Sequence, residues 1–238
     1  AFAIFVAVAP NKWIWSDYIL YTALILFIYS LFIAFGSYYM KANFFFKSIH
    51  SNKKGLCLTF DDGPHPIHTP KVLDILASHN LKATFFVMGK QSEGNEAILQ
   101  RMVAEGHVIG NHTWSHSNMT AMMFESTVDK EIKQTNEAIF KACGVKPIIF
   151  RPPFGVTNPR IGKAIKNNLM HSIGWDIRSY DTTAKSTDQL KTRILKEVDN
   201  GGSILLMHDN RPIAAEVLDE LLSELKSKNV VFANKVTG

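Results

Sequence analysis

Short apolar segments alternate with amphipathic segments along most of this 238-residue chain, from residue 55 to residue 234. The apolar segments are typical of buried strands, and the amphipathic ones are typical of helices. The seven predicted strands span residues 55–60, 82–89, 107–113, 147–155, 171–177, 202–209 and 230–234. The predicted helices begin near residue 69 and otherwise span residues 96–106, 126–143, 159–168, 187–199 and 214–227. This alternation predicts an α/β fold with a parallel sheet covered by helices.

An uncharged apolar run precedes this region. Residues 18–40 contain no charged side chain and are long enough to cross a bilayer as one helix. Aromatic residues flank the run, as they do at membrane interfaces. They are Trp13, Trp15, Tyr38 and Tyr39. We therefore predict a membrane anchor within residues 1–50 and a separate functional domain over residues 51–238. A buried core helix fits this length less well, and no small-residue cleavage site indicates a signal peptide.

Reactive polar side chains follow nearly every predicted strand. They are Asp61 and Asp62 after the first strand, His112 and His116 after the third, Arg151 within the fourth, Asp176 and Asp181 at and after the fifth, and His208 and Asp209 at the end of the sixth. Because the carboxyl ends of parallel strands meet at one edge of a sheet, we expect these side chains to gather there. The pattern favours a catalytic site over scattered structural residues.

The pairs His112/His116 and Asp61/Asp62 are best interpreted as parts of a metal site. Two histidines and one carboxylate make an open site for zinc or a similar divalent ion, and His112 and His116 are close enough in sequence to face one point. The adjacent Asp61 and Asp62 can divide two roles between them, one as a metal ligand and the other as a proton acceptor. The residues alone do not decide which aspartate takes which role.

Four motifs in this order resemble one enzyme family. They are TFDDGP (59–64), HTWSH (112–116), RPPFG (151–155) and LLMHD (205–209). Together they are similar to the metal-dependent polysaccharide deacetylases of carbohydrate esterase family 4, over about residues 55–236. The resemblance implies a distorted (β/α) barrel of about seven parallel strands. It also implies removal of N- or O-acetyl groups from sugars, chiefly N-acetylglucosamine units of a polysaccharide or peptidoglycan.

The resemblance also implies a role for each residue at the metal. Asp61 matches the general base of the family, and Arg151 matches a residue that orients this base. Asp62, His112 and His116 match the ligands of one divalent metal ion, zinc or another divalent transition metal.

The remaining implied roles concern the leaving group and the substrate groove. His208 matches the general acid, and Asp181 matches the aspartate that orients it. Phe154 and Trp175 match residues of the groove wall, with a backbone N–H near Phe154 at the oxyanion. In the family the aspartate is often followed by tryptophan, whereas Thr182 follows here, which puts the groove lining and the substrate length in question.

The expected partners are a carbohydrate and the lipid bilayer. The net charge of +5 comes without a basic run interleaved with aromatic residues, so the sequence does not favour nucleic-acid binding, and it gives no indication of an oligomer. We expect anchoring in the cytoplasmic membrane of a bacterium, with the side of the catalytic domain open. The lysine bias after residues 18–40 favours the cytoplasmic side, whereas a polymer substrate would favour the opposite one. Residues 1–9 could end a second helix or form a short re-entrant piece.

Two other functions remain as alternatives. The protein could remove an acyl or formyl group from a lipid-linked amino sugar, which would suit a membrane-tethered enzyme. It could also bind sugars without turnover. The second alternative is less favoured because no member of the predicted catalytic set is missing.

Overall fold

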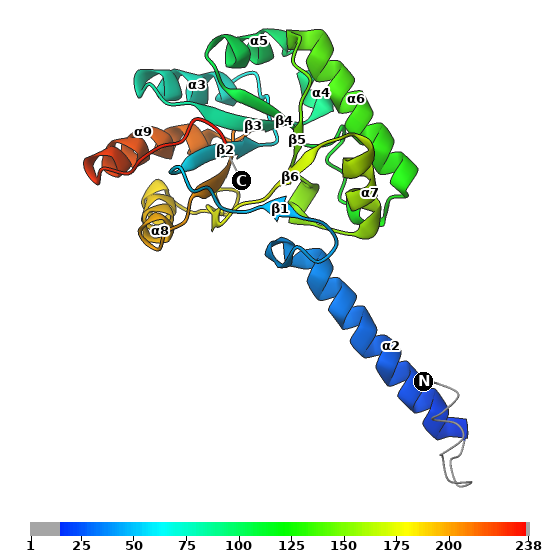
Figure 1. The fold of residues 1–238 in the computed structure, drawn as a ribbon. Helices are drawn as coiled ribbons and strands as arrows, with labels where there is room; N and C mark the ends of the chain where they lie inside the picture. The colour runs from blue at the N-terminus through cyan, green and yellow to red at the C-terminus, as the bar shows by residue number, and fades with distance from the viewer. Residues whose placement is uncertain (1–14, 237–238) are drawn as a thin grey trace.

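The computed structural model describes residues 15–236 as a sheet surrounded by helices, with one long helix projecting from it (Figure 1). The strands are β1 (Ser48–Ile49), β2 (Cys57–Asp61), β3 (Ala83–Val87), β4 (Val108–Asn111), β5 (Ile149–Phe150), β6 (His171–Ile173), β7 (Ile177–Arg178) and β8 (Ile204–His208). The α-helices are α2 (Trp15–Tyr38), α3 (His68–Ser78), α4 (Gly89–Ser92), α5 (Glu96–Ala104), α6 (Glu125–Cys143), α7 (Pro159–Asn167), α8 (Thr187–Asp199) and α9 (Pro212–Ser227). The 3-10 helices are η1 (Met40–Ala42), η2 (Thr120–Met122) and η3 (Pro153–Gly155). The predictions for residues 1–9 and Trp13 lie outside the described residues.

All eight strands are parallel and follow the order β1-β6-β5-β4-β3-β2-β8-β7. The segment between β6 and β7 crosses from one edge of this sheet to the other. Gly174 N donates to Ile49 O of β1 at 2.8 Å, whereas Asp176 N donates to Ile204 O of β8 at 3.3 Å. The predicted α/β fold with a distorted parallel barrel is therefore confirmed, in the form of a half-barrel whose open side is crossed by Gly174–Asp176.

The strand count differs from the predicted seven for three local reasons. β1 has only two residues, too few for a sequence pattern. The strand predicted over 171–177 is divided into β6 and β7 by the crossing segment. The strand predicted over 230–234 is wrong, because this segment contributes only a single bridge between Leu56 and Phe232.

Alternation along β2 separates the core from the site. Leu58 and Phe60 belong to the large apolar cluster that packs β2 and β3 against α3, α5 and α9. Thr59 and Asp61 point to the other side of the sheet, where both accept hydrogen bonds from Arg151. Polar groups are thus carried into the barrel interior by strands that are buried on both sides.

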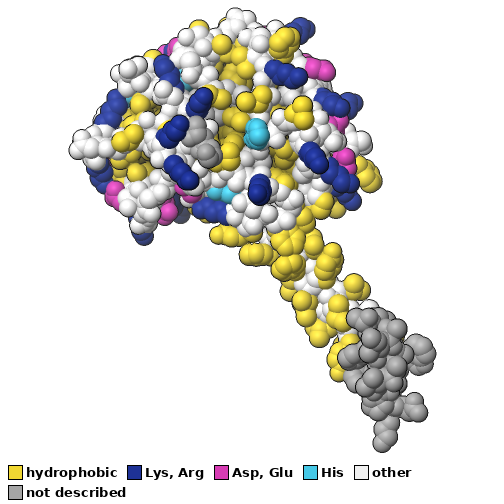
Figure 2. All heavy atoms as spheres, viewed as in Figure 1, with side chains coloured by type: hydrophobic (Ala, Val, Ile, Leu, Met, Phe, Trp, Pro, Cys, Tyr) yellow, Lys and Arg dark blue, Asp and Glu magenta, His cyan; other side chains and the backbone are white. Residues whose placement is uncertain are grey.

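Helix α2 is long and apolar enough to cross a membrane over Asp17–Tyr38. Its side chains are mostly exposed, and Figure 2 shows them as an apolar stalk below the domain. The last turn is tied to the domain: Thr157 N donates to Ser37 O at 2.9 Å, Thr157 Oγ1 donates to Gly36 O at 2.9 Å, and Ser37 Oγ donates to Thr157 O. The end of α2 is therefore fixed beside the loop that follows η3.

Candidate active site

A buried ion pair fixes Asp61 at the carboxyl end of β2. Arg151 Nη1 donates to Asp61 Oδ1 at 2.7 Å and to Thr59 Oγ1 at 2.8 Å. The same guanidinium donates to two backbone carbonyls, Ile173 O at 3.2 Å and Gly174 O at 2.8 Å. Arg151 is fully buried, so these bonds hold it in one orientation. One carboxylate oxygen of Asp61 is thereby occupied, and Oδ2 is turned toward His112 Nε2 at 3.7 Å.

Asp62, His112 and His116 direct one ligand atom each toward a common point. These three atoms lie within 4.8 Å of one another. Asp62 Oδ1 is 3.5 Å from Nε2 of both histidines. Asp62 has a φ of +72°, so its side chain leaves the alternation of β2 and lies on the same side as Asp61. The local backbone conformation therefore explains how two adjacent carboxylates converge.

The donor set fits a divalent cation. His112 Nδ1 donates to Arg151 O at 2.7 Å, which directs Nε2 toward the common point. Among residues 15–236, Asp62 Oδ1 has no hydrogen-bond partner although it is buried. Two imidazoles and one carboxylate are ligands for zinc and for several other transition metals, and they leave coordination positions for water and substrate.

Charge and burial shift the pKa values of the three proposed ligands. Burial opposes ionisation of Asp62, but the close approach of His112 and the positive charges of both histidines hold its pKa below its usual range. Burial and the neighbouring His112 lower the pKa of His116 to about 4, so His116 is neutral at neutral pH. Burial also opposes protonation of His112, yet Asp61 and Asp62 raise its pKa. A cation at this point therefore competes with a proton on His112.

His208, which is partly buried, and the buried Asp181 form a second pair next to Asp61. β2 and β8 place Asp61 opposite His208. Asp181 Oδ1 lies 2.8 Å from His208 Nδ1, and Asp181 Oδ2 accepts from His208 N at 2.7 Å. Thr182 N and Ser179 Oγ both donate to Asp181 Oδ1 at 3.0 Å. Burial disfavours protonation of His208, but Asp181 overcomes it and raises the pKa of His208 to about 9.

Phe154 and Trp175 border the same site. Phe154 has a φ of +58° and is half exposed, with its ring 4.6 Å from the ring of His116. Trp175 lies in the segment that crosses the open side of the barrel, and its ring packs against Gly155, which has a φ of +70°. A side chain at Gly155 would collide with this ring, so glycine is required for the close approach.

Glu131 on α6 is a supporting residue that the sequence analysis missed. Its carboxylate accepts from Trp114 N at 3.0 Å and from Ser115 N at 2.8 Å. These residues lie in the loop that carries His116, where His116 itself has a φ of +48°. No local sequence signal points to Glu131, because it lies on a different element and its helix shows only an ordinary amphipathic pattern.

Asp209 also supports the site, from behind the turn after β2. Thr69 Oγ1 donates to Asp209 Oδ2 at 2.6 Å, and the carboxylate fills the space that a side chain at Gly63 would need. Burial raises the pKa of Asp209 to about 7. The residue thus packs beneath the Asp61–Asp62 turn.

Comparisons with known proteins agree with this arrangement. A sequence profile described as polysaccharide deacetylase matches residues 48–173. Over 179 residues the chain is 36% identical to the peptidoglycan-N-acetylglucosamine deacetylase PgdA of Listeria monocytogenes, an alignment that covers 75% of this chain and 37% of the relative. Over 167 residues it is 35% identical to a chitooligosaccharide deacetylase of Rhizobium leguminosarum bv. trifolii, covering 70% of this chain and 77% of the relative.

The fold agrees as well. The structure of the peptidoglycan deacetylase PdaC from Bacillus subtilis superimposes with a TM-score of 0.69 at 31% identity, covering 76% of this chain and 86% of that one. The chain spans little more than a third of the length of the Listeria relative, 37%. The profile match, the identity to relatives and the shared fold together show that this chain belongs to the polysaccharide deacetylase family.

Proposed function

We propose that this protein is a metal-dependent hydrolase that removes the N-acetyl group from an amino sugar of a carbohydrate. The observation that carries the proposal is that three atoms able to bind a metal lie within 4.8 Å of one another, close to two charge pairs, Asp61–Arg151 and His208–Asp181. This arrangement supports a proton acceptor and a proton donor beside one bound cation. The names of the relatives, which include peptidoglycan and chitooligosaccharide deacetylases, support the acetylated sugar.

Each residue has a distinct proposed task. A divalent ion held by Asp62, His112 and His116, zinc or another transition metal, would polarise the acetamide carbonyl and make water at the site more acidic. Asp61 takes the proton of the attacking water, with Oδ1 fixed by Arg151. The water oxygen bonds to the carbonyl carbon.

The leaving group needs a proton donor. The C–N bond breaks as His208 gives its proton to the amine, so the products are acetate and the free amino sugar. Asp181 keeps His208 protonated and oriented for this step. The backbone N–H of Phe154 is the proposed partner of the oxyanion, and Phe154 and Trp175 offer aromatic faces to the sugar ring. O-acetyl groups would follow the same steps with an alcohol as the leaving group. Retention of base, acid and ligands favours catalysis over sugar binding alone.

We also propose that α2 anchors the protein in a membrane, in a bacterium the cytoplasmic membrane. The helix is exposed and apolar over Asp17–Tyr38, and Tyr38 and Tyr39 follow its last apolar turn. Aromatic residues of this kind lie at the headgroup level of a bilayer. Residues 51–238 would then form the catalytic domain, together with β1, which begins at Ser48 just before this range.

Acetate release from defined sugars tests the proposal. Purified full-length chain would be given chitooligosaccharides, peptidoglycan fragments and a lipid-linked N-acetyl amino sugar, each with added zinc, manganese or cobalt and after chelation. Metal-dependent acetate release from at least one sugar, abolished in Asp61→Asn, is expected. The absence of acetate from every substrate under all metal conditions would contradict the proposed function.

A further inference from the structure

A large cavity lies between the end of α2 and the loops of the proposed active site. This pocket, here called the junction pocket, has a volume of about 880 Å³. Its wall is formed by the end of α2 with η1, by the η3 turn, by the segment that crosses the barrel, and by α8. Tyrosines from the end of α2, Phe154 and Trp175 from the catalytic loops, and charged side chains of α8 all contribute to this wall. The volume is within the range of pockets that hold small organic ligands.

The junction pocket borders the proposed active site. Phe154 lines the pocket, and its ring also lies 4.6 Å from the ring of the proposed ligand His116. Tyr180 lines the pocket as well and directly precedes Asp181, the partner of His208. A molecule in the junction pocket can therefore place one end at the catalytic residues while the rest stays under α2.

Cationic side chains line the junction pocket without carboxylate partners. They are Lys41, Arg178, Arg193 and Lys196. Within residues 15–236, none of the four forms an ion pair; the ion-paired lysines and arginines all lie elsewhere. Arg178 and Arg193 lie 4.9 and 5.3 Å from the centre of the Tyr180 ring, so both guanidinium groups contact the same aromatic ring of the pocket wall. Guanidinium groups without carboxylate partners are suited to binding phosphate.

Three acidic residues also line the pocket, and they do not cancel this charge. Asp176 is already occupied, since its carboxylate accepts from Ser203 N at 2.9 Å and from Ile204 N at 2.6 Å. Asp188 and Glu197 remain on α8. The four cationic side chains thus outnumber the three carboxylates by one.

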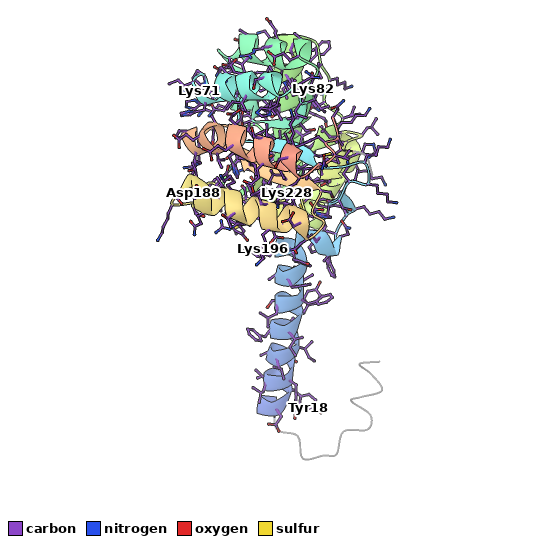
Figure 3. All side chains as sticks on the ribbon, turned by 90° about the vertical axis from the view of Figure 1, so that its left-hand side faces the viewer. Tyr18, Lys71, Lys82, Asp188, Lys196 and Lys228 are labelled. Atoms are coloured by element: carbon purple, nitrogen blue, oxygen red, sulfur yellow. The ribbon has the colours of Figure 1, made fainter. Side chains whose placement is uncertain are left out.

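If α2 spans a membrane, its end determines where this pocket lies relative to the lipid headgroups. Tyr38 is 81% exposed and Tyr39 is 49% exposed, and both line the pocket at the end of the apolar helix. Tyrosines that end a membrane span lie in the headgroup layer, where lipid phosphates are found. Figure 3 places Lys196 on α8 at the side of the domain nearest α2, whereas Lys71 on α3 lies on the far side. The cations of the pocket therefore face the level of lipid phosphates.

We infer that the substrate of this site is an N-acetyl amino sugar attached through a phosphate to a membrane lipid, with the phosphate bound in the junction pocket. This inference rests on the proposed deacetylation and on α2 as a membrane span. The sugar passes Phe154 to the catalytic residues, the phosphate lies between Arg178 and Lys196, and the lipid chain remains in the bilayer beside α2. An uncharged polymer such as chitin has no group that these cations would bind.

A matched pair of glycolipids tests the inference by binding. The first is N-acetylglucosamine 1-phosphate esterified to a long-chain alcohol, and the second is the neutral N-acetylglucosaminide of the same alcohol. Both would be titrated into phosphatidylcholine nanodiscs that hold the full chain carrying Asp61→Asn, which prevents turnover. We expect the phosphate glycolipid to bind at least about tenfold more tightly than the neutral one, with the preference lost in Arg178→Gln/Lys196→Gln.

Two controls separate this inference from the proposed function. Lys71→Gln/Lys130→Gln removes the same charge far from the pocket and should keep the phosphate preference. Arg178→Gln/Lys196→Gln with Asp61 intact should release acetate from soluble chitooligosaccharides within about twofold of the unmodified chain. Equal affinity for the two glycolipids would overturn the inference, and deacetylation of soluble oligomers would then still support the function. A phosphate preference without any acetate release would support phosphate binding in the junction pocket and contradict the proposed deacetylation.

Discussion

At the scale of single residues, the pairing of Asp61 with Arg151 separates two carboxylates that are adjacent in sequence. Asp61 is held by a fully buried guanidinium, whereas Asp62 is turned by its positive φ toward two imidazoles. In the proposed mechanism the same dipeptide would therefore supply a proton acceptor and a ligand atom. This division of roles leads to a direct test.

Asp61→Asn should lower deacetylation by roughly 10²–10⁴-fold, the usual contribution of a positioned general base. The amide keeps the size of the side chain but cannot take a proton from water. Bound metal, measured by elemental analysis, should stay the same because Asp62 and the histidines are intact. Asp219→Asn, which changes an exposed aspartate on α9, is the matched control. Loss of metal in Asp61→Asn would mean that the two aspartates exchange roles.

His116→Ala should strongly reduce bound zinc or manganese. The side chain supplies one of three ligand atoms within 4.8 Å of one another, and two remaining ligands hold a cation weakly. His171→Ala, at the exposed start of β6, is the matched histidine control and should leave the metal content unchanged. An unchanged metal content in His116→Ala would place the cation elsewhere.

The pair of His208 and Asp181 predicts the alkaline limit of activity. The pKa of His208 is raised to about 9, so the protonated form that serves the leaving amine persists through neutral pH and is lost as pH rises through this value. Asp181→Asn should lower this pKa toward that of free histidine, about 6.5, and move the alkaline limb of the pH profile downward.

The same pair predicts a pH dependence of stability. The favourable effect of the pair on folding is complete below about pH 6.5 and declines toward pH 9, so the unfolding midpoint of Asp181→Asn should differ most from that of the unmodified chain at low pH.

A comparison of an acetamide with an activated ester distinguishes whether His208 acts as a proton donor or as a binding residue. His208→Ala should impair a sugar acetamide far more than an activated aryl acetate, whose leaving group needs no proton. Asp181→Asn should show the same order with a smaller loss. Equal losses on both substrates would assign His208 to binding or to the metal.

At the scale of elements, the sequence indicates the strands that carry the site because their signals are local. The apolar segments around β2, β4 and β8 end at reactive side chains, and parallel topology brings such ends together. Asp61, His112 and His208 could be selected on this basis. The resemblance to the family then distinguishes Asp61 from Asp62, which strand alternation alone does not do.

Features made by distant segments could not be predicted in this way. The two residues of β1 pair with β6 across more than a hundred positions, and the crossing at Gly174–Asp176 depends on both edges of the sheet. Glu131 belongs to the same class, because its partners Trp114 and Ser115 lie on another element. Such contacts leave no periodic pattern in the sequence.

Glu131 supplies a prediction at this scale. Glu131→Ala should weaken metal affinity, by less than the roughly 10–100-fold that follows loss of a group bonded directly to a metal ligand. The carboxylate fixes the backbone of the loop that carries His116, but it touches no proposed ligand atom. Glu137→Ala, exposed on the same helix, is the control. A lower melting temperature with unchanged metal affinity would show that Glu131 serves folding alone.

At the scale of the whole molecule, the segment between α2 and the sheet joins the proposed anchor to the proposed catalytic domain. Phe46 packs with the smaller apolar cluster beneath α6 and α7, and Asn43 Oδ1 accepts from Ser48 N at 2.7 Å. Thr157 bonds to the last turn of α2. The position at which the anchor is removed should therefore decide whether the domain keeps its fold.

A chain that begins at Gly36 should be soluble and retain activity on small soluble sugars, because it keeps β1, Phe46 and the partners of Thr157. A chain that begins at Ser51 loses all three and leaves the edge of β6 unpaired. Its melting temperature should fall, by about 2–4 °C for each kcal/mol lost in a domain of this size, and an unpaired edge favours aggregation. Calorimetry, light scattering and acetate release on both chains make the comparison. If the chain from Gly36 aggregates while the chain from Ser51 stays folded and active, residues 36–50 belong to the anchor and not to the catalytic domain.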